Sequence, residues 1–175
     1  MLKTLLYIKT KINLRQYLVI PEKLKTVLSG DIADDAATIA TYSRDASLFE
    51  IRPTAVVFPK DKDDIKNLVL FAGENKGVGL TPRSAGTDMS GAAIGESIVL
   101  DFTRYFNHIK EIGDGYAVAE PGVYYRDFEK ATLEKGWLLP SYPASKDICA
   151  LGGMVGNNSG GEKTLRYGKT EDYVR

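Results

Sequence analysis

Residues 81–91 read Thr81-Pro82-Arg83-Ser84-Ala85-Gly86-Thr87-Asp88-Met89-Ser90-Gly91, and residues 151–161 read Leu151-Gly152-Gly153-Met154-Val155-Gly156-Asn157-Asn158-Ser159-Gly160-Gly161. We call them the first and the second glycine cluster. Of the 17 glycines of the chain, five fall within 77–95 and six within 152–168. Both clusters are poor in bulky side chains and rich in backbone N–H and short polar groups, which suits wrapping around a phosphate or a flat cofactor ring.

Composition limits the possible classes of protein. The chain has 175 residues, of which 43% are hydrophobic and 26% charged, as expected for a globular protein with one core or two small ones. Lys+Arg and Asp+Glu number 23 each, so nothing electrostatic indicates nucleic acid. The single cysteine, Cys149, suits a reducing compartment. Lysines interrupt the apolar residues of the N-terminus, and no later segment approaches membrane-spanning length, so we predict a cytoplasmic protein with at most peripheral membrane contact.

The first half of the chain predicts a βαβ-like unit. The alanine-rich segment from Asp31 to about Tyr42 favours a helix. Strands are expected at Ala55–Phe58, from Gly77 into the first glycine cluster, and at Ser97–Phe102. Asp61 can cap a helix with an apolar face formed by Ile65, Leu68, Val69 and Ala72. The first glycine cluster would therefore join two strands, whereas most mononucleotide loops lead into a helix.

The second half predicts a hairpin and a helix before the second glycine cluster. Alternating residues of Ile109–Ile112 and Tyr116–Ala119 surround the turn residues 113–115. Tyr124, Phe128 and Ala131 share a helical face, and Gly136 should end that helix.

Spacing excludes several familiar motifs. Gly156 and Gly161 bracket four residues as in a phosphate-binding Walker loop, but Lys163 arrives one position late. Pro82 stands where a dinucleotide fingerprint would have its third glycine. One histidine and one cysteine cannot furnish a zinc or iron site, and His108 has no serine elbow near it, so we interpret His108 as structural and expect no metal.

Six motifs, in this order along the chain, resemble the FAD-binding domain of the vanillyl-alcohol-oxidase or PCMH type, and within it the FAD-linked dehydrogenases typified by the glycolate oxidase FAD subunit and D-lactate dehydrogenase. They are Tyr42–Ser47, Arg52–Pro59, Pro82–Gly91 with the strand to Arg104, Val118–Val123, the second glycine cluster, and Tyr167–Val174. The resemblance covers about residues 35–175. It implies an α+β fold of two α+β subdomains, about 53–104 and from about 105, with FAD between them. Residues 1–34 would form a helical extension, and the C-terminal part of the domain and a substrate-binding cap would be absent from this chain.

The resemblance also implies the cofactor-binding residues. The diphosphate of FAD would meet Pro82, Arg83, Ser84, Ala85, Gly86, Thr87, Asp88, Ser90 and Gly91, whose amides can form a concave nest and whose hydroxyls can donate further hydrogen bonds. The flavin ring and ribityl chain would meet residues of the second cluster and its neighbours: Gly152, Gly153, Gly156, Asn157, Asn158, Gly160 and Gly161, with Pro143, Ser145, Ala150, Tyr167 and Gly168.

Some positions depart from the family pattern. Ser84 and Ala85 replace consecutive glycines, so the path of amides survives only if both keep negative φ angles. Ala150 replaces a hydroxyl residue that commonly contacts the flavin. Cys149 is expected to be a buried neighbour of the second cluster without a redox role. The first glycine cluster has no histidine that could tether the flavin, which predicts noncovalent FAD.

The function implied is an FAD-dependent oxidoreductase that takes a hydride equivalent from the CH–OH group of a small D-2-hydroxyacid resembling D-lactate or glycolate. Its electrons would pass to an acceptor protein, an iron–sulfur partner or a quinone. The family's catalytic base and any metal lie in the part that this chain lacks, so no catalytic residue is assigned. Two alternatives stay open: a noncatalytic flavin-binding fragment or split subunit, and a fold-sharing enzyme like UDP-N-acetyl-enolpyruvoylglucosamine reductase, which would need NADPH.

Overall fold

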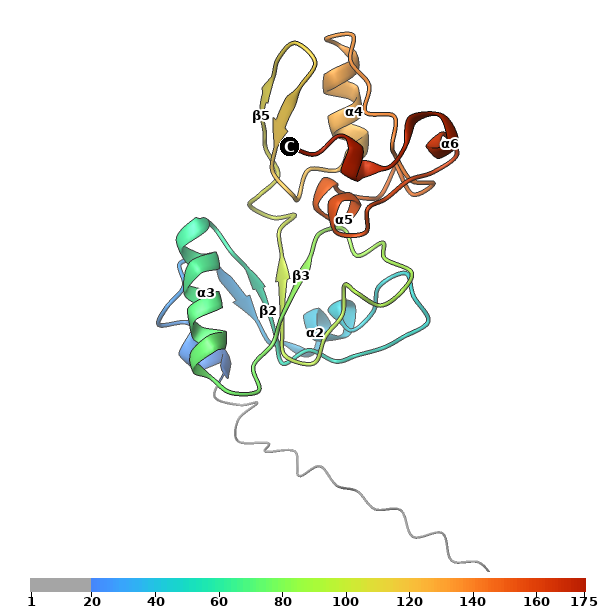
Figure 1. The fold of residues 1–175 in the computed structure, drawn as a ribbon. Coiled ribbons are helices and arrows are strands. Elements are labelled where there is room, and N and C mark those ends of the chain that lie inside the picture. The colour runs from blue at the N-terminus through green and yellow to red at the C-terminus, as the bar shows by residue number, and fades with distance from the viewer. Residues whose placement is uncertain (1–19) are drawn as a thin grey trace, which may run out of the picture.

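A computed structural model describes residues 20–175 of the chain and shows two lobes (Figure 1). The first lobe contains a four-stranded sheet with helices α2 (Ala36–Tyr42) and α3 (Lys62–Glu74). The second lobe contains a two-stranded hairpin, helices α4 (Tyr125–Leu133), α5 (Leu151–Gly156) and α6 (Thr164–Tyr167), and the 3₁₀ helix η1 (Thr170–Asp172). This is the predicted α+β fold of two α+β units. The predicted boundaries at residues 34 and 104 stay predictions, and the expected N-terminal helix over the first residues lies outside the described part of the chain.

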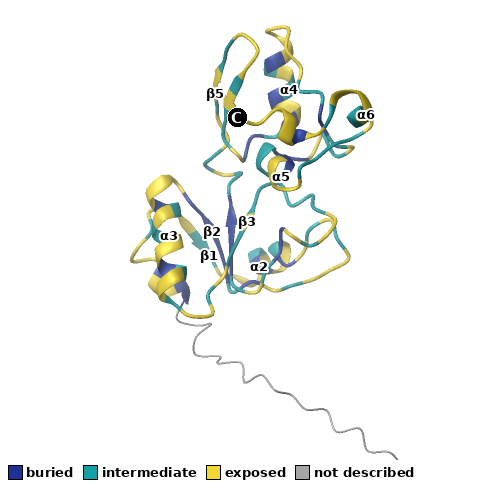
Figure 2. Ribbon diagram, viewed as in Figure 1, coloured by how far each residue is buried: buried dark blue, intermediate teal, exposed yellow. Residues whose placement is uncertain are grey.

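The sheet of the first lobe has the strand order β1-β2-β4-β3. Strands β2 (Ala55–Phe58), β4 (Ile98–Asp101) and β3 (Leu80–Arg83) are parallel, and β1 (Asp31–Ala33) pairs antiparallel with β2. All residues of β2 and β4 are buried, as the apolar run of a doubly covered parallel strand predicts (Figure 2). The βαβ unit β2-α3-β3 thus places β2 and β3 on either side of β4, and the first glycine cluster leads from β3 toward β4 without a helix.

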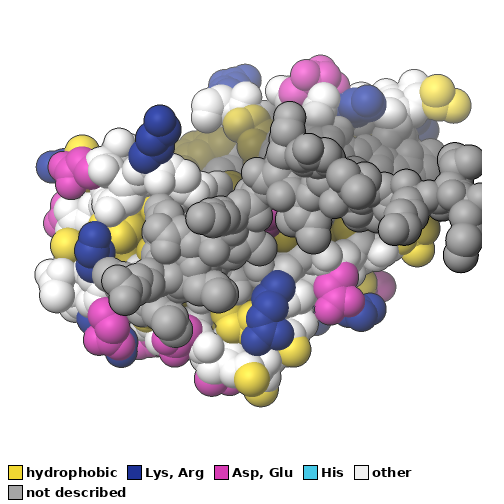
Figure 3. Space-filling view, turned by 90° about the horizontal axis from the view of Figure 1, so that it is seen from below, with side chains coloured by type: hydrophobic (Ala, Val, Ile, Leu, Met, Phe, Trp, Pro, Cys, Tyr) yellow, Lys and Arg dark blue, Asp and Glu magenta, His cyan; other side chains and the backbone are white. Residues whose placement is uncertain are grey.

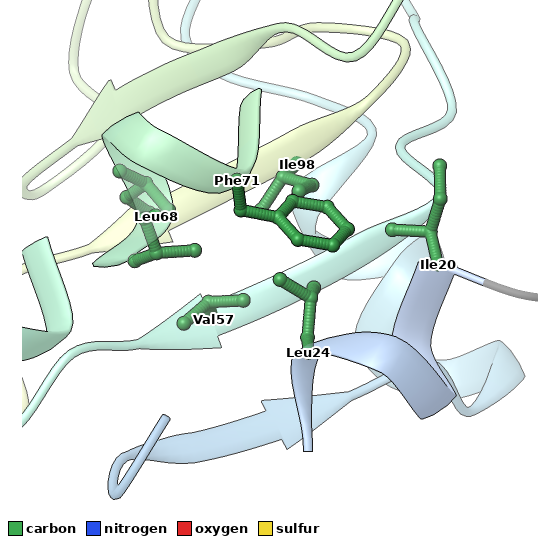
Figure 4. Packing of buried hydrophobic residues seen from close by; sticks show 7 residues of the cluster. Ile20, Leu24, Val57, Leu68, Phe71 and Ile98 are labelled. Carbon is green, nitrogen blue, oxygen red and sulfur yellow. The ribbon is translucent and has the colours of Figure 1, made fainter. Parts of the chain in front are cut away.

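Alternating side chains of β2 divide the core of the first lobe between the two faces of the sheet. Val57 packs with Leu68 and Phe71 of α3 and with Ile20 and Leu24 (Figure 4). On the other face, Val56 and Phe58 pack with Ile39 of α2. Ile20 and Leu24, which precede β1 in the chain, are therefore part of this core.

Two expectations for the first lobe are wrong. Residues 31–33 form β1 instead of the start of a helix, because they pair with β2, and α2 begins only after its N-cap Asp35. In α3, Asp61 caps the helix as predicted, but the buried face is Asp64, Leu68 and Phe71, and Val69 is 58% exposed. Asp64 is buried because its carboxylate accepts hydrogen bonds from the backbone N–H groups of Ser29 and Lys60, both at 2.8 Å.

The second lobe begins with the predicted hairpin. Strands β5 (Ile109–Ile112) and β6 (Ala117–Ala119) pair antiparallel around a turn in which Gly115 has a φ of 76°. Beneath the hairpin lies a core of Val123, Tyr125, Phe128, Tyr142, Cys149 and Met154. The buried face of α4 is Tyr125, Phe128 and Thr132, not the expected Tyr124, Phe128 and Ala131, because Tyr124 is the N-cap and lies outside the helix. Gly136, at a φ of 79°, follows the end of α4 as predicted.

The surface carries charges of both signs. Lys and Arg side chains alternate with Asp and Glu side chains over the face seen in Figure 3, without a wide region of one sign among the residues that it colours. Within residues 20–175, no helix is both long and apolar enough to cross a membrane.

Candidate functional site

The first glycine cluster keeps the backbone path that amide binding of an anion requires. Ser84 and Ala85 have negative φ angles, which confirms the condition set by the missing glycines, since Asn158 is the only non-glycine residue with a positive φ in the described part of the chain. Gly86 and Gly91 have φ angles of 67° and 89°, so both turn the backbone through the left-handed region.

The side chain of Arg83 lies beneath this cluster. Its guanidinium donates hydrogen bonds to the carbonyl oxygens of Arg44 at 2.7 Å and Ala93 at 3.4 Å, and it lies 4.9 Å from the ring centroid of Tyr42. The Tyr42 hydroxyl in turn donates to Asp101 at the end of β4, and burial followed by this hydrogen bond raises the pKa of Tyr42. The guanidinium thus supports the loop from within the protein.

Asp88 acts as an anion that its own loop binds. One oxygen of its carboxylate, Oδ2, accepts from the backbone N–H groups of Ser90 at 2.9 Å and Ala92 at 2.7 Å and from the Ser90 hydroxyl at 2.8 Å. Partial burial raises the pKa of Asp88, but these hydrogen bonds outweigh it and lower the pKa to about 2. The carboxylate is therefore ionised at neutral pH and has its donors in place.

The second glycine cluster begins as a short helix, α5, which the glycine content did not predict. Its N-cap is Ala150, which supplies no side-chain hydrogen bond. The backbone N–H groups of Leu151 and Gly152 donate to the carbonyls of Val123 at 2.9 Å and Pro121 at 2.8 Å. A Cβ atom at Gly152 would lie 2.8 Å from Cβ of Pro121, so glycine is required for this close approach.

The two glycine clusters meet at α5, at the junction between the lobes in Figure 1. A Cβ atom at Gly153 would lie 3.0 Å from the hydroxyl oxygen of Ser84. The side-chain amide of Asn157 donates to Oδ1 of Asp88 at 2.7 Å, across 69 positions of sequence. Distant segments thus form one surface, with backbone amides and hydroxyls from one lobe and glycines and carboxamides from the other.

The chain after α5 folds back over the second cluster. Asn158, at a φ of 45°, accepts the backbone N–H of Glu171 at 3.0 Å, and the hydroxyl of Thr170 donates to the carbonyl of Ser159 at 2.7 Å. Near Gly160 and Gly161, the Thr164 hydroxyl accepts the N–H of Gly161 at 2.8 Å. These hydrogen bonds fix the conformation of the segment from Asn158 to Gly161, which contains several of the expected cofactor-binding residues.

The other expected positions lie along the same segment or beside it. Pro143 lies against Gly161, whose Cβ position would be 3.2 Å from Cα of Pro143. The carbonyl of Ser145 accepts the N–H of Cys149 at 2.8 Å. The carbonyl of Tyr167 accepts the hydroxyl of Tyr173 at 2.6 Å, and Gly168 turns the chain at a φ of 76°.

Cys149 and His108 lie where the sequence interpretation expects them. Cys149 is 3% exposed in the core of the second lobe, and burial raises the pKa of its thiol. His108 stands at the base of the hairpin, where its backbone N–H and Nδ1 meet Glu120 at 3.0 and 2.9 Å. Lys110 forms an ion pair with the other oxygen of Glu120 at 2.7 Å. Partial burial raises the pKa of Glu120, but Lys110 and His108 lower it to about 2.

Sequence reasoning assigned no role to the groups that brace the site, although the family motifs contain them. Tyr42 and Asp101 hold the base of Arg83, and Pro121 receives Gly152, but none of these three bracing residues belongs to a glycine cluster. The sequence feature that could have indicated Pro121 is the Pro121-Gly122 pair. In the structure, a Cβ atom at Gly122 would lie 2.7 Å from the carbonyl oxygen of Phe106, so the backbone beside Pro121 is tightly packed. Crowded backbone on both sides of Pro121 marks it as a packing point.

The arrangement fits a flavin dinucleotide better than a catalytic centre. It offers backbone amides and hydroxyls of the first cluster and the glycine backbone of α5, which meet where Ser84 lies against Gly153, and such groups suit a flat, diphosphate-bearing molecule. Among residues 20–175 no cluster of His, Cys, Asp and Glu could hold a metal ion. The described residues thus suit the binding of a cofactor, and none of them is assigned as a base.

Comparisons with known proteins agree with this geometry. Residues 53–175 match the model of the family described as FAD binding domain. The chain is 32% identical over 150 residues to the D-2-hydroxyglutarate dehydrogenase of Escherichia coli strain K12, covering 83% of this chain and 15% of that protein. It is 34% identical over 161 residues to the glycolate oxidase subunit GlcD of Bacillus subtilis strain 168, covering 89% of this chain and 34% of that protein. The chain thus spans about a third or less of the length of these relatives.

A solved structure shares the fold. The alkyldihydroxyacetonephosphate synthase crystallised in P1 superposes with a TM-score of 0.75 at 22% identity, over 90% of this chain and 34% of that one. The expected fold is thereby confirmed.

Proposed function

Because the chain belongs to the FAD binding domain family, we propose that it is the FAD-carrying part of an oxidoreductase that oxidises the CH–OH group of a D-2-hydroxyacid. The observation that carries the proposal is the meeting of the two glycine clusters, through Ser84 beside Gly153 and Asp88 bonded to Asn157. The names of the relatives, a D-2-hydroxyglutarate dehydrogenase and a glycolate oxidase subunit, support the substrate class.

FAD, the cofactor of the family, supplies the chemistry when bound: it takes a hydride equivalent from the alcohol carbon of the substrate. The residues of this chain bind and orient it. Amides and hydroxyls of Ser84–Thr87 would receive the diphosphate, where charge-assisted hydrogen bonds are strongest. Gly152 and Gly153 let α5 pack closely against Pro121 and Ser84, and the backbone of α5 with Asn157 and Asn158 would lie beside the flavin.

The remaining roles are proposals for the whole protein. A base that accepts the substrate proton, and any metal that binds the hydroxyacid, would lie outside this chain. The electrons would leave to an acceptor protein, an iron–sulfur partner or a quinone. The cytoplasmic location expected from the sequence stays a prediction.

One experiment tests the proposal in two steps. Purified protein is denatured, and the released cofactor is identified by mass spectrometry; FAD is expected, and FMN alone would overturn the assignment of a diphosphate site. The FAD-loaded protein is then mixed without oxygen with D-2-hydroxyglutarate, D-lactate or glycolate, and the visible flavin absorbance is followed. Bleaching by one of them, with a dye acceptor restoring the colour, supports the oxidoreductase. L-2-hydroxyglutarate and L-lactate serve as matched controls.

A second candidate is a noncatalytic flavin-binding module, either a fragment or one part of a split enzyme. The observation that favours it is the small share of the relatives that the chain covers, 15% and 34%. Bound FAD that no hydroxyacid reduces would favour this candidate. Addition of NADPH then distinguishes the enolpyruvoylglucosamine reductase alternative, which would bleach the flavin with NADPH and not with hydroxyacids.

A further inference from the structure

We propose that Asp88 is a positioning residue: it fixes the carboxamide of Asn157 so that the oxygen, and not the amino group, faces the bound cofactor. This inference rests on the proposed FAD site between the two glycine clusters. The two residues belong to different lobes, and the bond from Asn157 Nδ2 to Asp88 Oδ1 is 2.7 Å long.

The orientation follows from the chemistry of the two groups. An ionised carboxylate only accepts hydrogen bonds, and a carboxamide has one donor end and one acceptor end. The Asp88 carboxylate is held ionised by Ser90 and Ala92. Only the amino group of Asn157 can therefore face it, and the planar carboxamide turns its oxygen away from Asp88.

The oxygen of Asn157 is available to a ligand. None of the described residues donates a hydrogen bond to it, and the residue is exposed at the C-cap of α5. Its backbone N–H is already used by the carbonyl of Gly153 at 3.0 Å, so the helix fixes where the side chain starts. The group that this oxygen can recognise is a donor, such as a hydroxyl or a ring N–H of the cofactor, and not a phosphate or carbonyl oxygen.

Asp88 also joins the two halves of the cradle. An unpaired carboxylate near a diphosphate would repel it, whereas Asp88 has three donors from its own loop and one from the other lobe. Its negative charge is therefore stabilised by donors within the protein, and the same residue links the first cluster to α5.

The test exchanges the two side chains. In Asp88→Asn the loop donors retain the amide oxygen, so the new amino group faces Asn157, which must turn its own amino group toward the cofactor. We expect the affinity for FAD, measured by fluorescence titration of the apoprotein, to fall about tenfold, the equivalent of one lost hydrogen bond of this kind. Asn157→Asp places two carboxylates face to face and is expected to lose at least as much.

The double variant D88N/N157D is the decisive member of the series. The amide introduced at position 88 can donate to one oxygen of the carboxylate introduced at position 157. The second oxygen of that carboxylate then remains an acceptor toward the cofactor, and the net charge is that of the original chain. We expect affinity to return to within about threefold of the unmodified protein. A double variant as weak as the worse single variant would overturn the proposal.

A matched control removes one bond of Asp88 within its own loop. Ser90→Ala removes a hydroxyl donor to Asp88 but does not change the bond between Asp88 and residue 157. Combining it with Asn157→Asp should therefore not restore the affinity for FAD. If S90A/N157D recovered affinity as well as D88N/N157D, Asp88 would act through loop stability alone and the proposal would be wrong.

A readout without FAD separates this proposal from the proposed function. Urea unfolding of the unmodified protein, the two single variants and D88N/N157D should show that the single changes are not additive, because the residues are bonded to each other. If the changes in unfolding free energy were additive, Asp88 and Asn157 would not be bonded to each other, and this result would hold independently of FAD binding. Coupled stabilities in a protein that binds no FAD would reject the cofactor-facing role and the proposed function, and leave only the link between the lobes.

Discussion

The guanidinium of Arg83 occupies the place toward which a side chain at Gly86 would point. A Cβ atom there would lie 2.6 Å from the guanidinium carbon, and Gly86 has a φ of 67°. The family resemblance implies that Gly86 lets the backbone approach the diphosphate, whereas the structure gives the glycine a contact with Arg83 on the protein side. The loop rests on Arg83, and the open face of the cluster is turned toward α5.

Gly86→Ala is therefore expected to weaken both the fold and FAD binding. The left-handed backbone alone costs about 1–3 kcal/mol for a residue with a side chain, and the new methyl group must also displace Arg83. Chemical denaturation gives the stability and fluorescence titration the affinity. Gly73→Ala is the matched control: Gly73 lies in α3 with nothing within 4 Å of its Cβ position, and alanine there should raise stability by about 0.5–1 kcal/mol. Equal effects of the two changes would contradict this account.

Gly152→Ala should separate α5 from the rest of the site. Its methyl group would crowd Pro121, and overpacking of this kind costs about 1–3 kcal/mol. Because α5 carries Gly153 and is capped by Asn157, FAD affinity should fall more than stability explains. Gly156→Ala, in the same helix with open space around its Cβ position, should leave stability unchanged or slightly higher. The family resemblance also expects Gly156 to meet the flavin, so this variant tests that expectation: a loss of FAD affinity at unchanged stability would place the cofactor at Gly156.

Acid should destabilise the second lobe through Glu120. Its pKa is lowered from 4.5 to about 2 in the folded protein, so its contribution is complete above about pH 5 and is lost as the pH falls toward 2. The contribution is on the order of 2 kcal/mol, since His108 and Lys110 are largely exposed. Unfolding followed between pH 6 and 2 should be less pH-dependent in Glu120→Gln. Asp114→Asn, in the exposed turn of the same hairpin, should keep the original slope.

FAD should leave the protein on denaturation. His108 is engaged by Glu120 at the base of the hairpin, and the Cys149 thiol is buried with a raised pKa, so neither is placed or ionised to form a bond to the flavin. After acid precipitation and washing, the flavin fluorescence is expected in the supernatant. Fluorescence that stays with the pellet would refute the prediction, and His108→Ala and Cys149→Ala would then locate the bond.

Local sequence patterns predicted correctly the elements that depend mainly on their own residues. Ala55–Phe58 is a strand as predicted, because four consecutive buried apolar residues fit a doubly covered parallel strand. Asp61 caps α3, and the turn around Gly115 closes the hairpin, as turn chemistry dictates. The family resemblance was confirmed by the match over residues 53–175.

Tertiary contacts decided the elements that the sequence did not reveal. Residues 31–33 have helix-compatible composition but become β1 because β2 offers a free edge. Gly152 and Gly153 are poor helix formers, yet they lie in α5 because Pro121 and Val123 accept the first N–H groups of the segment. The bond between Asp88 and Asn157 joins residues 69 positions apart, and no local pattern predicts it.

The position of β4 in the middle of the sheet has a consequence for synthesis of the chain. Strands β2 and β3 do not pair with each other. Each pairs with β4, which is the last of the four strands of this sheet to be synthesised. No parallel pairing can form on a growing chain until residues 98–101 have left the ribosome. The glycine loop between β3 and β4 is closed by the same event, so a nascent chain that can hold the diphosphate must already have completed its first sheet.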